Sequence, residues 1–117
     1  MTDHDPRTSV VVVSTDLPGA TVAHVAGDLD VTSVETLRAE LTARLDERPA
    51  VLVADLTRVR LLGSLGIAAL LEIHLEAQRR GVEFAVVADH RAVLRPLQIT
   101  QVDQVITIHR GLEDAVA

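Results

Sequence analysis

The chain has 117 residues, enough for one domain with a single core, and 48% of them are hydrophobic. Its formal net charge is −6, and its eleven basic residues are all arginines scattered along the sequence. This balance argues against binding to a phosphate backbone. Phe84 is the single aromatic residue, which argues against stacking of bases, and the absence of cysteine excludes disulfides and thiolate chemistry.

The N-terminal segment differs in composition from the rest of the chain. Residues 1–8 are polar and acidic, unlike a signal peptide, and we predict a disordered lead-in there. Residues 9–117 then form one domain. No apolar run approaches the roughly 20 residues that a membrane helix needs, so we expect a cytoplasmic protein without a membrane partner.

A β-hairpin is predicted first. Residues 9–14 contain four consecutive valines and indicate a strand. The segment 16–19 carries a Pro-Gly pair and predicts a turn. Residues 21–26 form the second strand, antiparallel to the first, and the Gly-Asp-Leu-Asp sequence at 27–30 ends it.

A helix and a buried strand follow. Thr32 and Glu35 have the spacing of a capping box, which predicts that the helix begins at Thr32. Apolar residues recur every three or four positions from 34 to 45 and form one stripe, and Pro49 marks the end. The apolar segment 51–56 is typical of a strand buried on both faces of a parallel sheet.

The second half alternates between the two kinds of element. We predict helices at 64–80, 91–100 and 112–117, and strands at 84–88 and 105–109. Gly81 supplies a left-handed cap for the first of these helices, and Pro96 lies near the start of the second or kinks it. The result is a single α/β domain: an N-terminal hairpin, then parallel β-α-β units, with about five strands in a mixed sheet and about four helices.

Ser64 is the most informative residue. It is placed between a buried strand and a helix, where free backbone N–H groups and the positive end of the helix dipole favour a phosphate. Ser64 is therefore either a simple helix cap or a phosphorylation site. A hydrolase nucleophile is disfavoured, because position 62 is Leu rather than the glycine of a nucleophile elbow and no histidine is near in sequence.

Three aspartates are placed near this loop. Asp28 and Asp30 follow the second strand, and Asp55 ends the third. Aspartate at such positions is often only a cap or a turn residue. Alternatively Asp28 or Asp30 lies beside Ser64, where it would orient the hydroxyl and repel a phosphate of −1.5 to −2 charges.

Leu65 is predicted to be exposed. On a helical wheel it shares a side with Ala69, Glu72 and Glu76, whereas residues such as Leu75 point to the core. An exposed leucine is usually without meaning, but one beside a switch is a plausible contact for a partner.

The sequence shows no spacing typical of a metal site, a cofactor site or a catalytic site. The five histidines are far apart in sequence and no metal site is expected. No glycine-rich phosphate loop occurs, so no cofactor is expected. Acid, base and nucleophile do not converge, so we expect no catalytic residue and no enzyme.

The motifs together resemble a family. The segments 55–57 and 63–67, Asp-Leu-Thr and Gly-Ser-Leu-Gly-Ile, resemble the signature of STAS domains, especially of bacterial anti-sigma factor antagonists. The family pattern is Asp-Leu-Ser/Thr, a short apolar stretch, then Asp-Ser-Ser/Thr-Gly-Leu. The segment 27–30 is similar to the family's Gly-Glu-Leu-Asp. The resemblance covers about residues 9–117, with Gly63 in place of the family's Asp and Leu65 in place of Ser or Thr.

The resemblance implies a function. Members bind an anti-sigma factor that is also a serine kinase, which frees the sigma factor; the kinase phosphorylates the motif serine and a phosphatase resets it. By this resemblance the residue of this chain that matches the phosphorylated position is Ser64. The expected partner-binding residues are Asp28, Asp30, Leu62, Gly63, Ser64, Leu65 and Gly66.

Two alternatives stay open. One is a STAS module that binds partners constitutively, as an interaction or scaffold domain with a degenerate phosphorylation site. The other is a small-ligand-binding STAS domain, for a nucleotide or a lipid, that uses the same loop.

Overall fold

The computed structural model describes residues 10–116, and the lead-in expected at 1–8 lies outside them. The elements in chain order are β1 Val10–Leu17, β2 Ala20–Leu29, α1 Val34–Asp46, β3 Val51–Leu62, α2 Ser64–Arg80, β4 Glu83–Val87, α3 Arg91–Ile99, the 3₁₀ helix η1 Val102–Gln104, β5 Thr107–His109 and α4 Leu112–Val116. The alternation of strands and helices agrees with the one predicted.

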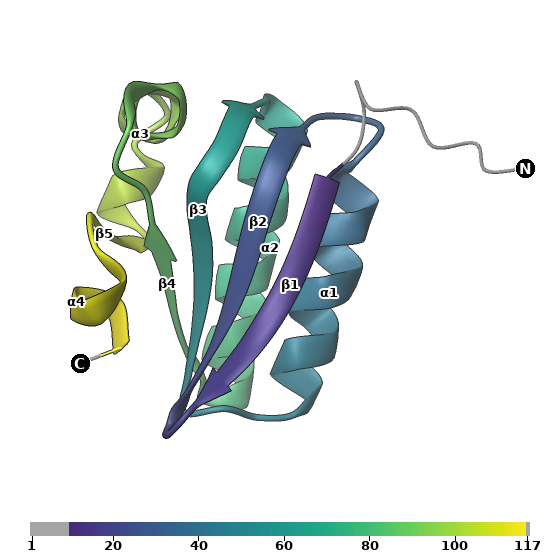
Figure 1. Ribbon diagram of the computed structural model, residues 1–117, viewed down its shortest axis with the longest axis vertical. Coiled ribbons are helices and arrows are strands. Elements are labelled where there is room, and N and C mark those ends of the chain that lie inside the picture. Colours follow the sequence, from purple (N-terminus) through teal and green to yellow (C-terminus); the bar gives the residue numbers. More distant parts are fainter. Residues whose placement is uncertain (1–9, 117) are drawn as a thin grey trace, which may run out of the picture.

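The strands form one mixed sheet in the order β1-β2-β3-β4-β5. β1 is antiparallel to β2, and every other neighbouring pair is parallel. Figure 1 shows α1 and α2 side by side behind β1, β2 and β3, with α3 and α4 toward the β4 and β5 side. The predicted α/β class, the hairpin and the five-stranded sheet are confirmed.

The main core fills the space between the sheet and the helices. Leucines of α1 at positions 37, 41 and 45 have no exposed surface, and neither has Leu70 of α2. A smaller apolar cluster joins Val22, Val53 and Val87 to Ala115 of α4. These three valines alternate with core residues along their strands, so α4 covers part of the opposite face of the sheet.

β2 and β3 are longer than expected. β2 does not stop at residue 26 but runs to Leu29, which still pairs with Leu62 of β3. β3 continues six residues beyond position 56 and carries two bulges in its pairing with β2. The extra residues of the bulges disturb the strict alternation of faces, which is why the sequence pattern underestimated the strand.

The start of α1 differs from the predicted capping box. The helix begins at Val34, and Thr32 lies in a turn before it. The backbone N–H and hydroxyl of Thr32 donate to the carboxylate of Asp30, at 3.0 and 2.7 Å. This local bond competes with capping, so Thr32 and Glu35 do not form the reciprocal pair.

Helix α2 has the predicted bounds, and Gly81 ends it with a left-handed φ of 70°. Its buried face is different from the expected one. Ala69 has no exposed surface, whereas Leu75 is 53% exposed. Small residues such as Ala69 and Ala77 let the helix approach the sheet closely, so size at the contact decides the buried face more than hydrophobicity does.

The last strand, in contrast to β2 and β3, is shorter than predicted. The turn after η1 includes residues 105 and 106, whose backbone N–H groups both donate to the carbonyl of Val102. β5 therefore begins at Thr107. The helix at α3 is confirmed, with Pro96 inside it.

Candidate functional site

Ser64 stands exposed at the first position of α2. The cap residue before it is Gly63, in an extended conformation with φ −85° and ψ 175°, and no described side chain caps the helix. The carbonyl of Gly63 accepts the N–H of Ile67 at 3.1 Å, which closes the first turn. The N–H groups of that turn are thus left to solvent or to an anion.

The strand ends bring two loops together. The N–H of Gly63 donates to the carbonyl of Leu29 at 2.9 Å, and Asp28 pairs with Leu61 in the sheet register. The loop after β2 therefore adjoins the start of α2, as parallel neighbours require. An added side chain at Gly63 would place its Cβ 3.3 Å from that carbonyl, so glycine suits this close approach.

The two carboxylates of this loop are engaged locally. Asp28 forms an ion pair with Arg60, with 3.3 Å between Oδ1 and Nε. Hydrogen bonds from the Thr32 hydroxyl and backbone, with further ones from Ser33, lower the pKa of Asp30 despite the opposing effect of desolvation. Within the described residues neither carboxylate hydrogen-bonds Ser64, so the predicted orientation of the serine hydroxyl by Asp28 or Asp30 is not seen.

Ser33 holds the loop in place, a role that sequence reasoning missed. Its side chain is buried; the hydroxyl donates to the carbonyl of Asp28 at 2.5 Å and accepts the N–H of Asp30 at 3.1 Å. The serine thus replaces the missing backbone partners where β2 ends. The sequence offered Thr32 and Ser33 side by side, and only the fold decides which one turns inward.

The carboxyl ends of β2 and β3 carry an apolar surface. Val31, Leu61 and Leu65 are 71%, 50% and 43% exposed. The exposure of Leu65 agrees with the prediction. Leu62 and Gly66, also expected in the partner surface, are buried. Gly66 packs against Leu62 and Leu29, and the pairing register of β3 turns Leu62 inward and Leu61 outward. Leu61 is thus the exposed leucine of this pair.

A model of the STAS domain matches residues 11–115. The chain belongs to the STAS domain family. The family assignment agrees with the described fold and with the resemblance of the 55–57 and 63–67 segments.

Relatives of this STAS domain carry a common description. The anti-sigma-F factor antagonist RsfB of Mycobacterium tuberculosis is 29% identical over 108 residues, covering 92% of this chain and 88% of that protein. The crystal structure of an anti-sigma factor antagonist from Mycobacterium paratuberculosis is 30% identical, with a TM-score of 0.87 and 92% of both chains covered. The unphosphorylated form of the anti-sigma factor antagonist SpoIIAA shares the fold at 16% identity, with a TM-score of 0.74 and 91% and 93% coverage.

Within residues 10–116 no group of three or more His, Asp or Glu residues is arranged to hold a metal ion. No helix in this range is long and apolar enough to cross a membrane.

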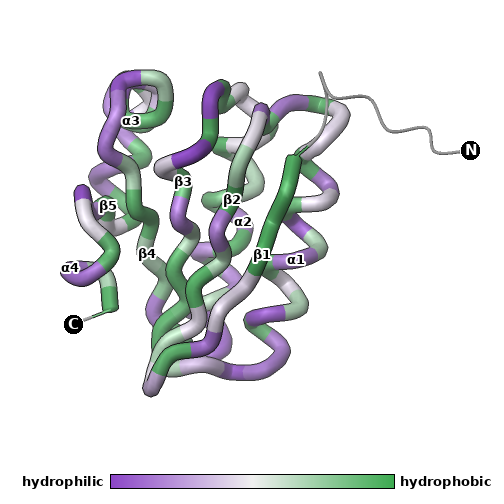
Figure 2. Tube along the Cα trace, in the orientation of Figure 1, coloured by the Kyte–Doolittle hydropathy of each residue, from purple (hydrophilic) through white to green (hydrophobic). Residues whose placement is uncertain are grey.

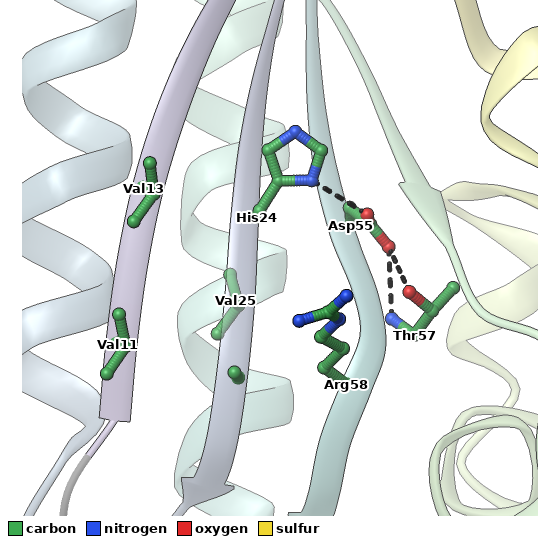
Figure 3. Close-up of a pocket in the computed structure, with 8 residues that line it drawn as sticks. Val11, Val13, His24, Val25, Asp55, Thr57 and Arg58 are labelled. Carbon is green, nitrogen blue, oxygen red and sulfur yellow. Dashed lines mark hydrogen bonds and ion pairs between the residues drawn. The ribbon is translucent and has the colours of Figure 1, made fainter.

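Asp55 lies away from the Ser64 loop, on the face of the sheet opposite α1 and α2. Contrary to the prediction, Asp55 lies within β3 and does not end it. Its Oδ2 is 2.9 Å from Nδ1 of His24, and its Oδ1 accepts the N–H and the hydroxyl of Thr57 at 3.1 and 2.8 Å (Figure 3). Partial burial raises the pKa of Asp55, but the hydrogen bonds from Thr57 and His24 outweigh it and leave the pKa lowered.

This lowered pKa predicts an acid-dependent loss of stability. Because Asp55 is more acidic folded than unfolded, its contribution is complete above the unfolded pKa of about 3.9 and is lost as the pH falls through the folded value. We expect Asp55→Asn to be less stable than wild type at pH 7 and the two curves to converge below about pH 4. Urea unfolding followed by circular dichroism across this range measures both curves, with Asp103→Asn as the control. Parallel curves for wild type and Asp55→Asn would contradict the assignment.

Proposed function

We propose that this chain is an anti-sigma factor antagonist: it binds an anti-sigma factor, and phosphorylation of Ser64 ends the binding. The observation that carries the proposal is an exposed serine at the start of α2 with exposed leucines on both sides of it in sequence, Leu61 and Leu65. The descriptions of the mycobacterial relatives support the same role. The chain acts by binding rather than by catalysis.

The partner surface consists of the carboxyl ends of β2 and β3 and the first turn of α2. Val31, Leu61 and Leu65 supply exposed apolar area, and Gly63 and Ser64 supply backbone that a partner can approach closely. An apolar centre with polar surroundings is typical of surfaces that dock another protein. Asp28, which is paired with Arg60, and Asp30 supply the polar rim, and the charge of Asp30 favours a basic neighbour on the partner.

Phosphorylation acts through electrostatics without refolding. The uncapped N–H groups of α2 donate to the phosphate oxygens within the domain, and the helix dipole favours negative charge there. At the interface the same phosphate is a buried charge without a counter-charge, so it opposes docking. The anti-sigma factor is the kinase in this scheme, a phosphatase restores the hydroxyl, and the proteins meet in the cytoplasm.

The test uses the intact chain in its source organism. We expect affinity purification of the tagged protein to retain a serine kinase of the anti-sigma type. Incubation of the two proteins with ATP should add one phosphate, about 80 Da, to wild type and none to Ser64→Ala. Retention of the kinase without a mass gain would favour the constitutive module. Failure to retain a kinase would contradict the proposal.

A further inference from the structure

A cavity of about 510 Å³ lies on the sheet face that α1 and α2 do not cover. Its walls come from β1, β2 and β3, and include Val11, Val13, His24, Asp55 and Arg58 (Figure 3). The volume falls within the range of pockets for small molecules, about 300–1,000 Å³. No part of the proposed partner surface at Ser64 is needed to form it.

A bulge in β3 places Arg58 in this cavity. His24 pairs with Asp55, whereas Ala26, two residues on, pairs with Arg58, three residues on. In a regular strand residues three apart point to opposite faces, so without the bulge Arg58 would point into the core. With it, Leu56 and Val59 both stay buried while Asp55 and Arg58 share the open face. Bulges of this kind often re-aim a side chain at a site.

Among the described residues that line the cavity, Arg58 is the charged side chain without an ion-pair partner. The carboxylate of Asp55 already accepts bonds from Thr57 and His24. Arg58 forms no ion pair with any residue between 10 and 116, and in Figure 3 its guanidinium reaches from β3 toward β2. A guanidinium prefers a planar anion that accepts two parallel hydrogen bonds, which a carboxylate provides.

The wall opposite Arg58 is apolar. Val11 and Val13 of the edge strand β1 are 56% and 57% exposed and face the cavity. Figure 2 shows the start of β1 as a strongly hydrophobic stretch at the outer edge of the sheet. Exposed valines on an edge strand are normally avoided, because such strands promote aggregation. Exposed valines beside an arginine fit a ligand that has both an apolar part and a negative charge.

We propose that this cavity binds a small monocarboxylate with an unbranched alkyl chain. The carboxylate lies against the guanidinium of Arg58, and the alkyl chain lies along Val11 and Val13. The site is separate from the Ser64 surface, so the proposal stands whether or not the chain is regulated by phosphorylation.

Octanoate is the probe for the test. In methyl-labelled protein we expect saturable shifts of the Val11 and Val13 methyl groups and of the His24 ring on titration with octanoate. Arg58→Gln should lower the affinity at least tenfold, and Val13→Thr, which keeps the β-branched shape, should lower it severalfold. Arg60→Gln is the matched control: it removes an exposed arginine two residues further along β3 and should bind octanoate as wild type does.

Two further ligands separate the parts of the site. Octanol keeps the chain without the charge, and acetate keeps the charge without the chain; both should bind at least tenfold more weakly than octanoate. Equal binding of octanol and octanoate, equal binding by Arg58→Gln and wild type, or shifts confined to the start of α2 would each overturn the proposal. The absence of any shift would also overturn the proposal, and a protein partner would then be the alternative ligand for the cavity.

Discussion

Replacing Ser64 by aspartate is expected to weaken binding of the anti-sigma factor at least tenfold. The new carboxylate stands at the first helical position, exposed, between the apolar residues that would contact the partner. Burying an uncompensated charge in an interface costs several kcal/mol, more than the roughly 1.4 kcal/mol that corresponds to a tenfold change. The fold itself should tolerate the change, because negative charge at a helix N-terminus contributes about 0.3–1 kcal/mol of stability.

Isothermal titration with the purified anti-sigma factor gives the affinity, and urea unfolding gives the stability of each variant. Ser64→Ala should bind like wild type, since the hydroxyl makes no hydrogen bond with residues of the described range. Ala50→Asp places the same charge at the opposite end of β3, in an exposed position, and should also bind like wild type. If Ser64→Ala lost as much affinity as Ser64→Asp, binding would depend on the hydroxyl and not on the charge. The proposed electrostatic effect of phosphorylation would then be wrong.

The sequence located Ser64 correctly because local signals define its helix. Ser64, which follows a buried strand, and Gly81, seventeen residues further on, mark the two ends of α2, and neither signal depends on distant contacts. The same holds for the hairpin, where the Pro-Gly turn fixes the pairing of β1 with β2. Elements delimited by their own turn and cap residues could therefore be predicted.

The parts that were missed depend on pairing between distant segments. Leu61 and Leu62 are identical residues, and only the bulged register of β3 against β2 decides that Leu61 is exposed. Arg58 was not identified as a site residue for the same reason, since regular alternation places it on the buried face. The capping box predicted from Thr32 and Glu35 does not form, and the buried hydroxyl of Ser33 instead bonds the backbone of Asp28 and Asp30 at the end of β2.

The approach of α2 to the sheet predicts the largest effect on stability. Gly66 lies in the first turn of the helix, and an added Cβ would stand 2.8 Å from Cδ1 of Leu62 and 3.1 Å from Cβ of Leu29. Both leucines are buried, and the carbonyl of Leu29 is held by the N–H of Gly63, so neither has room to move away. We expect Gly66→Val to lower the free energy of unfolding by about 1–3 kcal/mol through overpacking, despite the better helix propensity of valine.

Urea unfolding followed by far-ultraviolet circular dichroism measures this loss, because the chain has no tryptophan or tyrosine for fluorescence. Gly111→Val is the matched control: its new Cβ would meet only the carboxylate of Glu113, an exposed side chain that moves freely, so the change should stay within about 0.5 kcal/mol. Adding Leu62→Ala to Gly66→Val tests the cause. The double variant should lose less than the sum of the two single losses, because the alanine removes the atom that the valine strikes. If the two losses in the free energy of unfolding were strictly additive, the strain would not arise from the contact between positions 66 and 62. The position of α2 on the sheet, and with it the exposure of Ser64, would then not depend on this contact.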